Sequence, residues 1–163
     1  QIEVTDVFCC LGTTMKKAGS EEQFRKVDFA LPVAAGEAAK LKHVRHYLVV
    51  SAIGANRKSS LFYNKVKGEL EYELQKLGFP FLTIMQPSLL LGDRDESRLL
   101  EKLSGTFFSC LKPVMIGGLA NVAPINATDV AKRMLNEAKG VENETRSAEC
   151  ITVKSGEMLK PNY

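Results

Sequence analysis

Ser51, Tyr63 and Lys67 are the residues whose types and spacing could perform chemistry together. Tyr63 and Lys67 are four residues apart in a segment of helical periodicity, so both side chains project from one helix face. Ser51 ends an apolar segment of strand length, and ligands of open α/β sheets bind at the carboxyl ends of strands. A hydroxyl, a phenol and an ammonium group could therefore contact one carbonyl or alcohol oxygen.

The chemistry expected of this set is proton exchange with a carbonyl or an alcohol. A phenol with a pKa near 10 is a poor acid-base group at neutral pH, but a neighbouring lysine cation favours the phenolate and lowers that pKa. Tyr63 would exchange the proton, and Ser51 would hold the substrate oxygen. The alternative is structural, because a tyrosine and a lysine at this spacing are commonly a half-buried aromatic and a solvent-facing charge.

The elements that must position these residues follow an α/β pattern with a mostly parallel sheet, in a single domain over residues 1–163. Apolar segments of strand length alternate with segments of helical period. Strands are predicted over 4–11, 46–51, 79–85 and 150–153, and helices over 22–41, 61–77, 97–111 and 129–138. The helix over 61–77 has an apolar stripe of Val66, Leu70, Leu74 and Leu77, and Gly78 ends it. Thr128 or Asp129 is expected near the cap of the last helix.

Several segments together resemble the short-chain dehydrogenase/reductase superfamily. The similarity is strongest to its atypical branch, which holds the Tat-interacting-protein oxidoreductases and bacterial relatives described as nucleoside-diphosphate-sugar epimerases. It rests on DVFCCLGTT at 6–14, VVSAIGAN at 49–56, FYNKVKGE at 62–69 and PSLLLGDR at 87–94, and it covers about residues 4–138.

The resemblance implies a Rossmann fold that binds NADP or NAD and acts on an unidentified carbonyl or alcohol. Tyr63 would be the acid-base group, with Ser51 on the substrate oxygen and Lys67 on the ribose hydroxyls. The remaining cofactor contacts implied are Leu11, Gly12 and Thr13 against the ribose and diphosphate, and Pro87 and Ser88 beside the nicotinamide.

The sequence departs from the superfamily pattern in two places. Gln86 stands where many relatives have arginine before the proline, and we expect altered local hydrogen bonding without loss of chemistry. No GxxGxxG turn for the cofactor diphosphate is present. We therefore expect this chain to be the C-terminal part of a dinucleotide-binding domain, with a small substrate-side region near 93–130. About 50 to 70 residues are expected before Gln1, by analogy with the size of the missing half.

Composition excludes several other classes. The chain has 163 residues, is 45% hydrophobic and 25% charged, and carries a net charge of +3. Its apolar stretches are too short for a transmembrane helix. The excess of basic residues lies in residues 1–67, with 11 Lys or Arg against six acids, which suits a phosphate-bearing ligand or a solvated surface. Without tryptophan or an aromatic-interleaved basic stripe, nucleic-acid binding is not favoured.

Metal, disulfide and acid-pair chemistry also have little support. His43 and His46 lack a third ligand at metal spacing. Four irregularly spaced cysteines suit a reducing cytoplasm, and the adjacent pair at 9 and 10 is expected to be buried. The acids at 93, 95 and 96 suit a helix start.

Three functions remain open at this stage. The first is an NAD(P)-dependent oxidoreductase, and the second is a non-enzymatic NAD(P)H-binding regulator acting through protein contacts. The third, a structural fragment without a ligand, is disfavoured because it leaves Ser51, Tyr63 and Lys67 without a role.

Overall fold

A four-stranded parallel sheet forms the centre of the molecule. The computed structural model describes residues 4–91, 124–142 and 149–159. The strands are β1 (Asp6–Cys9), β2 (His46–Val50), β3 (Phe81–Gln86) and β6 (Glu149–Lys154), in the order β1-β2-β3-β6. A second, two-stranded parallel pair joins β4 (Leu90–Leu91) to β5 (Ile125–Asn126). The helix predicted over 97–111, most of the region near 93–130 and the acids at 93, 95 and 96 lie outside the described residues.

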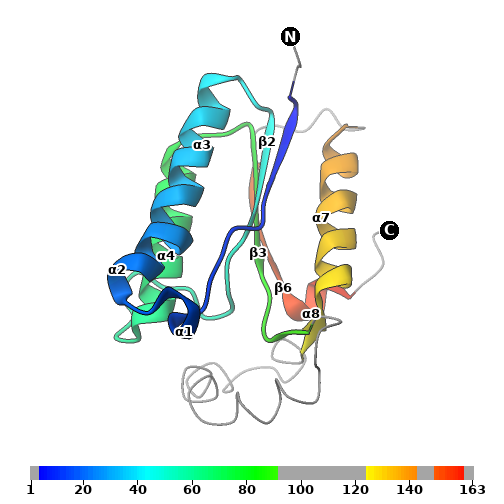
Figure 1. Ribbon diagram of the computed structural model, residues 1–163. Helices are drawn as coiled ribbons and strands as arrows, with labels where there is room; N and C mark the ends of the chain where they lie inside the picture. Colours follow the sequence, from blue (N-terminus) through cyan, green and yellow to red (C-terminus); the bar gives the residue numbers. More distant parts are fainter. Residues whose placement is uncertain (1–3, 92–123, 143–148, 160–163) are drawn as a thin grey trace.

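Helices cover both faces of this sheet. One face carries α4 (Phe62–Lys76) and a continuous helical run of α2 (Glu21–Arg25), η1 (Lys26–Ala30) and α3 (Leu31–Leu41). The other carries α7 (Ala127–Glu142) and the short α8 (Ser155–Met158), as Figure 1 shows. A further short helix, α1 (Met15–Ala18), follows the end of β1. The predicted α/β class with a parallel, Rossmann-like sheet is thus confirmed.

Two apolar cores separate the sheet from its helices. Because side chains alternate along a strand, Tyr47 and Val49 of β2 face α3 and α4, whereas Leu48 faces α7. Tyr47 stacks on Phe79 with ring centroids 5.0 Å apart, and its hydroxyl donates to the carbonyl of Pro32 at 2.9 Å. The same alternation carries the residue after β2, Ser51, to the α4 side.

The helix predicted as one piece over 22–41 contains a π-helical turn. Within η1 the Leu31 N–H bonds the Lys26 carbonyl, five residues back. Pro32 has no N–H to donate to the Asp28 carbonyl, so an ordinary α-helical bond is unavailable at this point. The wider turn lies next to that gap, and it presents a buried Asp28 toward α4.

The strand predicted over 4–11 is shorter and more exposed than expected. Val4, Phe8 and Leu11 are 45%, 42% and 43% exposed, although Leu48, the register partner of Phe8, is fully buried. Among the described residues β1 pairs only with β2, and the α7 layer contacts β3. The expectation that both adjacent cysteines are buried is also wrong for Cys10, which lies beyond the strand and is exposed, whereas Cys9 is buried.

The helix over 61–77 has the predicted form. Val66, Leu70 and Leu74 are fully buried, Leu77 follows the last helical residue, and Gly78 has the left-handed φ of 63° that ends many helices. In α7 the outcome differs slightly from the prediction. The helix begins at Ala127, so Thr128 and Asp129 lie inside its first turn.

Candidate functional site

The predicted site residues gather where the parallel strands end. Leu11 to Thr13 follow β1, Ser51 follows β2, and Pro87 follows β3. Backbone bonds join these ends: the Ser51 N–H donates to the Met85 carbonyl at 2.7 Å, and the Ile53 N–H to the Pro87 carbonyl at 2.9 Å. This carboxyl edge of the sheet is the place where open α/β folds bind ligands.

A buried ion pair lies beneath the segment after β1. Lys67 Nζ is 2.7 Å from Asp28 Oδ1, and the two side chains are only 4% and 2% exposed. The other oxygen of Asp28 accepts the backbone N–H of Thr13 at 2.7 Å. Asp28 thus joins two residues, Thr13 and Lys67, that the family resemblance assigns to one cofactor.

Asp28 was missed from the sequence, although it carried a signal. It stands in an apolar segment, VDFALPV at 27–33, just before the helix-disrupting Pro32. A lone acid on the core side of a helix is rare unless it is paired. The lysines of the helix predicted over 61–77 were candidates for the partner of Asp28.

A second polar group surrounds Ser51. Its hydroxyl donates to Glu71 Oε1 at 2.5 Å, and Gln86 Nε2 donates to both Glu71 oxygens at 2.9 and 3.1 Å. Burial raises the pKa of the Glu71 carboxyl, although hydrogen bonds from Ser51 and Gln86 oppose that shift. Glu71 was also missed, yet it continues the four-residue spacing of Tyr63 and Lys67 along α4.

Tyr63 lies in the first turn of α4, half-buried, with its ring 5.7 Å from that of Phe24. Ser51 and Lys67, by contrast, are buried and held by carboxylates. Leu11 and Gly12 are exposed, whereas Pro87 and Ser88 are buried. The Ser88 N–H donates to Ser155 Oγ at 2.6 Å, which ties the segment after β3 to α8.

The approach of α4 to the segment after β2 depends on Gly68. A Cβ at this position would lie 2.2 Å from the backbone N of Arg57 and 2.3 Å from the carbonyl carbon of Asn56. No side chain fits in that space. Gly68 therefore allows the segment between Ser51 and Tyr63 to fold back closely against the helix that carries Lys67.

The residues at this edge fit a nicotinamide dinucleotide. A lysine ammonium has three N–H donors, and the Asp28 contact leaves donors of Lys67 for ribose hydroxyls. The exposed segment at Leu11 and Gly12 offers backbone beside the same pair, and a Cβ at Gly12 would come no closer than 3.5 Å to Asp28. A dinucleotide here would meet donors and open backbone.

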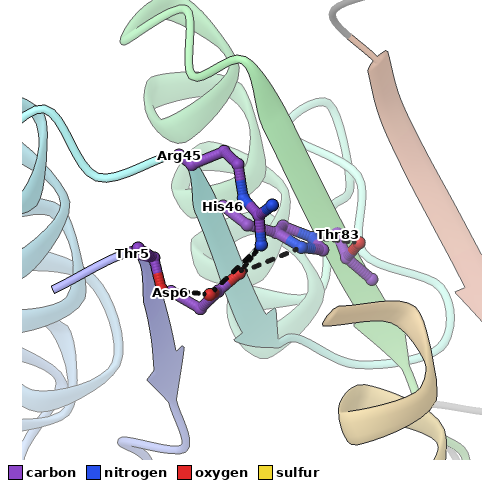
Figure 2. Close-up of polar contacts among 5 residues, drawn as sticks. All are labelled: Thr5, Asp6, Arg45, His46 and Thr83. Atoms are coloured by element: carbon purple, nitrogen blue, oxygen red, sulfur yellow. Dashed lines mark hydrogen bonds and ion pairs between the residues drawn. The ribbon is translucent and has the colours of Figure 1, made fainter. Parts of the chain in front are cut away.

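A different polar cluster lies at the opposite, amino end of the strands, as Figure 2 shows. His46 Nε2 is 2.8 Å from Thr83 Oγ1, and Arg45 Nη2 is 3.2 Å from Asp6 Oδ1. His43, by contrast, is exposed, with a φ of 55°. Within the described ranges no three histidine, cysteine or acidic residues gather as a metal site would require. No helix in those same ranges has the length and hydropathy to cross a bilayer.

Sequence comparison finds clear relatives. The chain is 37% identical over 159 residues to the mitochondrial protein FMP52 of Candida albicans, covering 96% of this chain and 68% of that protein. It is 39% identical over 129 residues to HTATIP2 of Rattus norvegicus, covering 79% and 51%. The chain therefore spans about half to two thirds of the length of these relatives. No protein-family model matches it.

Structural comparison finds the same fold in nucleotide-sugar enzymes. MoeE5 in complex with UDP-glucose and NAD superposes with a TM-score of 0.62 at 10% identity, over 95% of this chain and 60% of that one. UDP-glucose 4-epimerase of Thermotoga maritima gives 0.59 at 13% identity, over 93% and 56%. At these identities the likeness shows the fold.

Proposed function

The chain belongs to the FMP52/HTATIP2 family, and from that premise we propose that it carries the catalytic half of an NAD(P)-dependent oxidoreductase. The reaction is hydride transfer to a carbonyl or from an alcohol. The observation that carries the proposal is the buried carboxylate of Asp28, which pairs with Lys67 and also accepts the backbone N–H of Thr13. Residues 1–163 would form one domain, the C-terminal part of the dinucleotide-binding unit.

The proposed reaction assigns one role to each of three side chains. Lys67 would bind ribose hydroxyls and favour the phenolate of Tyr63, which lies one helical turn earlier on α4. Tyr63 would give its proton to the substrate oxygen or take one from it, while Ser51 orients that oxygen. When bound, the nicotinamide supplies or accepts the hydride. The further contacts proposed are Leu11, Gly12 and Thr13 to the ribose and diphosphate, and Pro87 and Ser88 to the nicotinamide.

The decisive experiment separates binding from chemistry in the full-length protein. Calorimetry with NADPH and NADH should show binding, and NADPH oxidation should be followed with a panel of aldehydes and ketones. Tyr63→Phe should retain nucleotide affinity and lower turnover by about 10² to 10⁴, the usual contribution of a positioned proton donor. Unchanged turnover would remove Tyr63 from the mechanism.

The role of Lys67 can be tested with two matched lysine variants on α4. Lys67→Met removes the buried ammonium, whereas Lys65→Met removes an exposed one from the same helix. Nucleotide affinity should fall only for Lys67→Met, provided that both variants unfold cooperatively. Equal affinities would make Lys67 a structural partner of Asp28 alone.

A second candidate function is a non-enzymatic NAD(P)H-binding regulator. It is favoured by one comparison, because HTATIP2 is the Tat-interacting protein 2 and so is named for a protein contact. This alternative predicts nucleotide binding with no turnover by wild type, and binding unaltered by Tyr63→Phe.

Cellular location is a separate matter. The cytoplasmic location expected from the sequence stays a prediction, because FMP52 of Candida albicans is described as mitochondrial. Fractionation of cells that express the full-length protein would distinguish the two compartments.

A further inference from the structure

When Glu71 is ionised, the hydroxyl proton of Ser51 is committed to its carboxylate. A serine hydroxyl has one proton to donate, and Ser51 gives it to Glu71 Oε1 at 2.5 Å. Gln86 donates to the same carboxyl, so both oxygens of Glu71 act as acceptors. In this state Ser51 can meet a substrate oxygen only as an acceptor, which suits an alcohol and not a carbonyl.

A carbonyl oxygen needs the opposite arrangement. It has no proton to give, and it gains negative charge as hydride reaches the carbon, so it is stabilised by donors. A hydrogen bond to a carboxylate is roughly twice as strong as one between neutral groups, and ionised Glu71 therefore retains the Ser51 proton. Protonated Glu71 could donate to Ser51 Oγ instead and release that proton toward the substrate.

We propose that Glu71 is a positioning residue that sets the direction of the Ser51 hydroxyl, and that Ser51 donates to a substrate carbonyl when Glu71 is protonated. The inference rests on the substrate-binding role of Ser51 in the proposed function. In carbonyl reduction the carbon receives hydride, the oxygen receives the Tyr63 proton, and the products are an alcohol and oxidised nucleotide. Glu71 keeps its proton throughout, so it tunes a hydrogen bond and takes no part in the net reaction.

The groups around Glu71 act on its pKa in both directions. Ser51 and Gln86 face it from the ends of β2 and β3, Lys67 lies one turn earlier on α4, and Cys150 lies within electrostatic range on β6. Burial, the largest effect, raises the pKa of Glu71, while Ser51, Gln86 and Lys67 lower it. Lys67 is bound by Asp28, and Gln86 is neutral, so neither places a free cation against the carboxyl.

The first test needs no ligand. Protein labelled with ¹³C at the glutamate δ-carboxyl should be titrated by NMR, with Glu71→Gln identifying the Glu71 resonance. Ser51→Ala removes a donor to the carboxylate, so the pKa of Glu71 should rise relative to wild type. Glu73→Gln, the same change at a half-exposed partner of Lys76, should leave that pKa unaltered. An equal pKa in Ser51→Ala and wild type would overturn the proposal.

The second test is the pH profile of carbonyl reduction by the holoenzyme with NADPH. In wild type kcat/KM should fall about tenfold per pH unit above the pKa of Glu71. Glu71→Gln presents an amide donor to Ser51 at every pH, so this descending limb should disappear, whereas Glu73→Gln should retain it. A limb that persists in Glu71→Gln overturns the inference and leaves the proposed function intact. If the protein binds no nucleotide, the proposed function is overturned, whereas the NMR result on Glu71 still holds.

Discussion

The two ends of one sheet bury polar groups in opposite ways. At the amino end, neighbouring strands supply His46 and Thr83 side by side, and the charged pair of Arg45 and Asp6 stays partly exposed, at 33% and 18%. At the carboxyl end, two helices bring Asp28 and Lys67 together with almost no exposure. The first cluster avoids buried charge, and the second contains it.

The difference between the two clusters indicates which one to examine for a function. A fully buried ion pair is weak evidence for stability, because desolvating two charges offsets much of their attraction. An apolar pair of similar volume would serve the core at least as well. The charged pair at the carboxyl end is therefore the one that the proposed binding of ribose by Lys67 would require. At the amino end the fully buried members, His46 and Thr83, are neutral at pH 7, so that cluster makes no such demand.

The largest effect is expected when one half of the buried pair is removed. Asp28→Ala strands the Lys67 ammonium in the interior and should lower the free energy of unfolding by about 3 to 5 kcal/mol. Asp6→Ala, at the partly exposed pair, should lower it by about 1 kcal/mol or less. Urea unfolding of both variants measures the difference. Equal losses would end the distinction between the two clusters.

His46 should give the next largest effect, and only in acid. Burial lowers the pKa of His46 to about 4, whereas an unfolded histidine titrates near 6.5. Between these values the unfolded chain binds the proton and the folded one does not, so stability falls as pH falls. The full loss is about 3 kcal/mol, complete below pH 4 and absent above pH 7.

The matched variant is His46→Gln, which keeps a polar side chain without a titrating ring. Unfolding should be measured in urea at pH 7.5 and at pH 4.5 for both proteins. The pH-dependent loss should be about 2 to 3 kcal/mol larger in wild type than in His46→Gln. If both lose the same amount, other groups account for the acid sensitivity.

Gly68 tests whether the carboxyl end depends on close backbone approach. Gly68→Ala places a Cβ 2.2 Å from the Arg57 backbone N and should destabilise the fold by about 2 to 3 kcal/mol. Gly140→Ala, in α7, meets nothing within 4 Å and should stabilise by about 0.5 to 1 kcal/mol. Thermal unfolding of the pair should therefore shift in opposite directions.

Sequence patterns predicted the scaffold better than its polar contacts. Strand and helix periodicities depend on local order, so β2, β3 and α4 were placed within a residue or two. The Asp28 contact depends on a π-turn and on the register between two helices, and neither is encoded in a periodic pattern. Phe8 shows the same limit, because exposure of an apolar strand depends on which layer covers it.

The smallest effect should come from Thr83, the neutral partner at the amino end. Thr83→Val preserves shape but leaves His46 Nε2 without the 2.8 Å contact, in a buried site. The expected loss is about 1 to 2 kcal/mol at pH 7.5, the cost of an unsatisfied buried polar atom. Thr83→Ser should recover most of it. Because the acid sensitivity arises from burial of His46 and not from this bond, Thr83→Val should keep the wild-type loss between pH 7.5 and 4.5. A changed pH dependence would mean that Thr83 helps to hold His46 neutral, and the amino-end cluster would then be electrostatically coupled like the one at the carboxyl end.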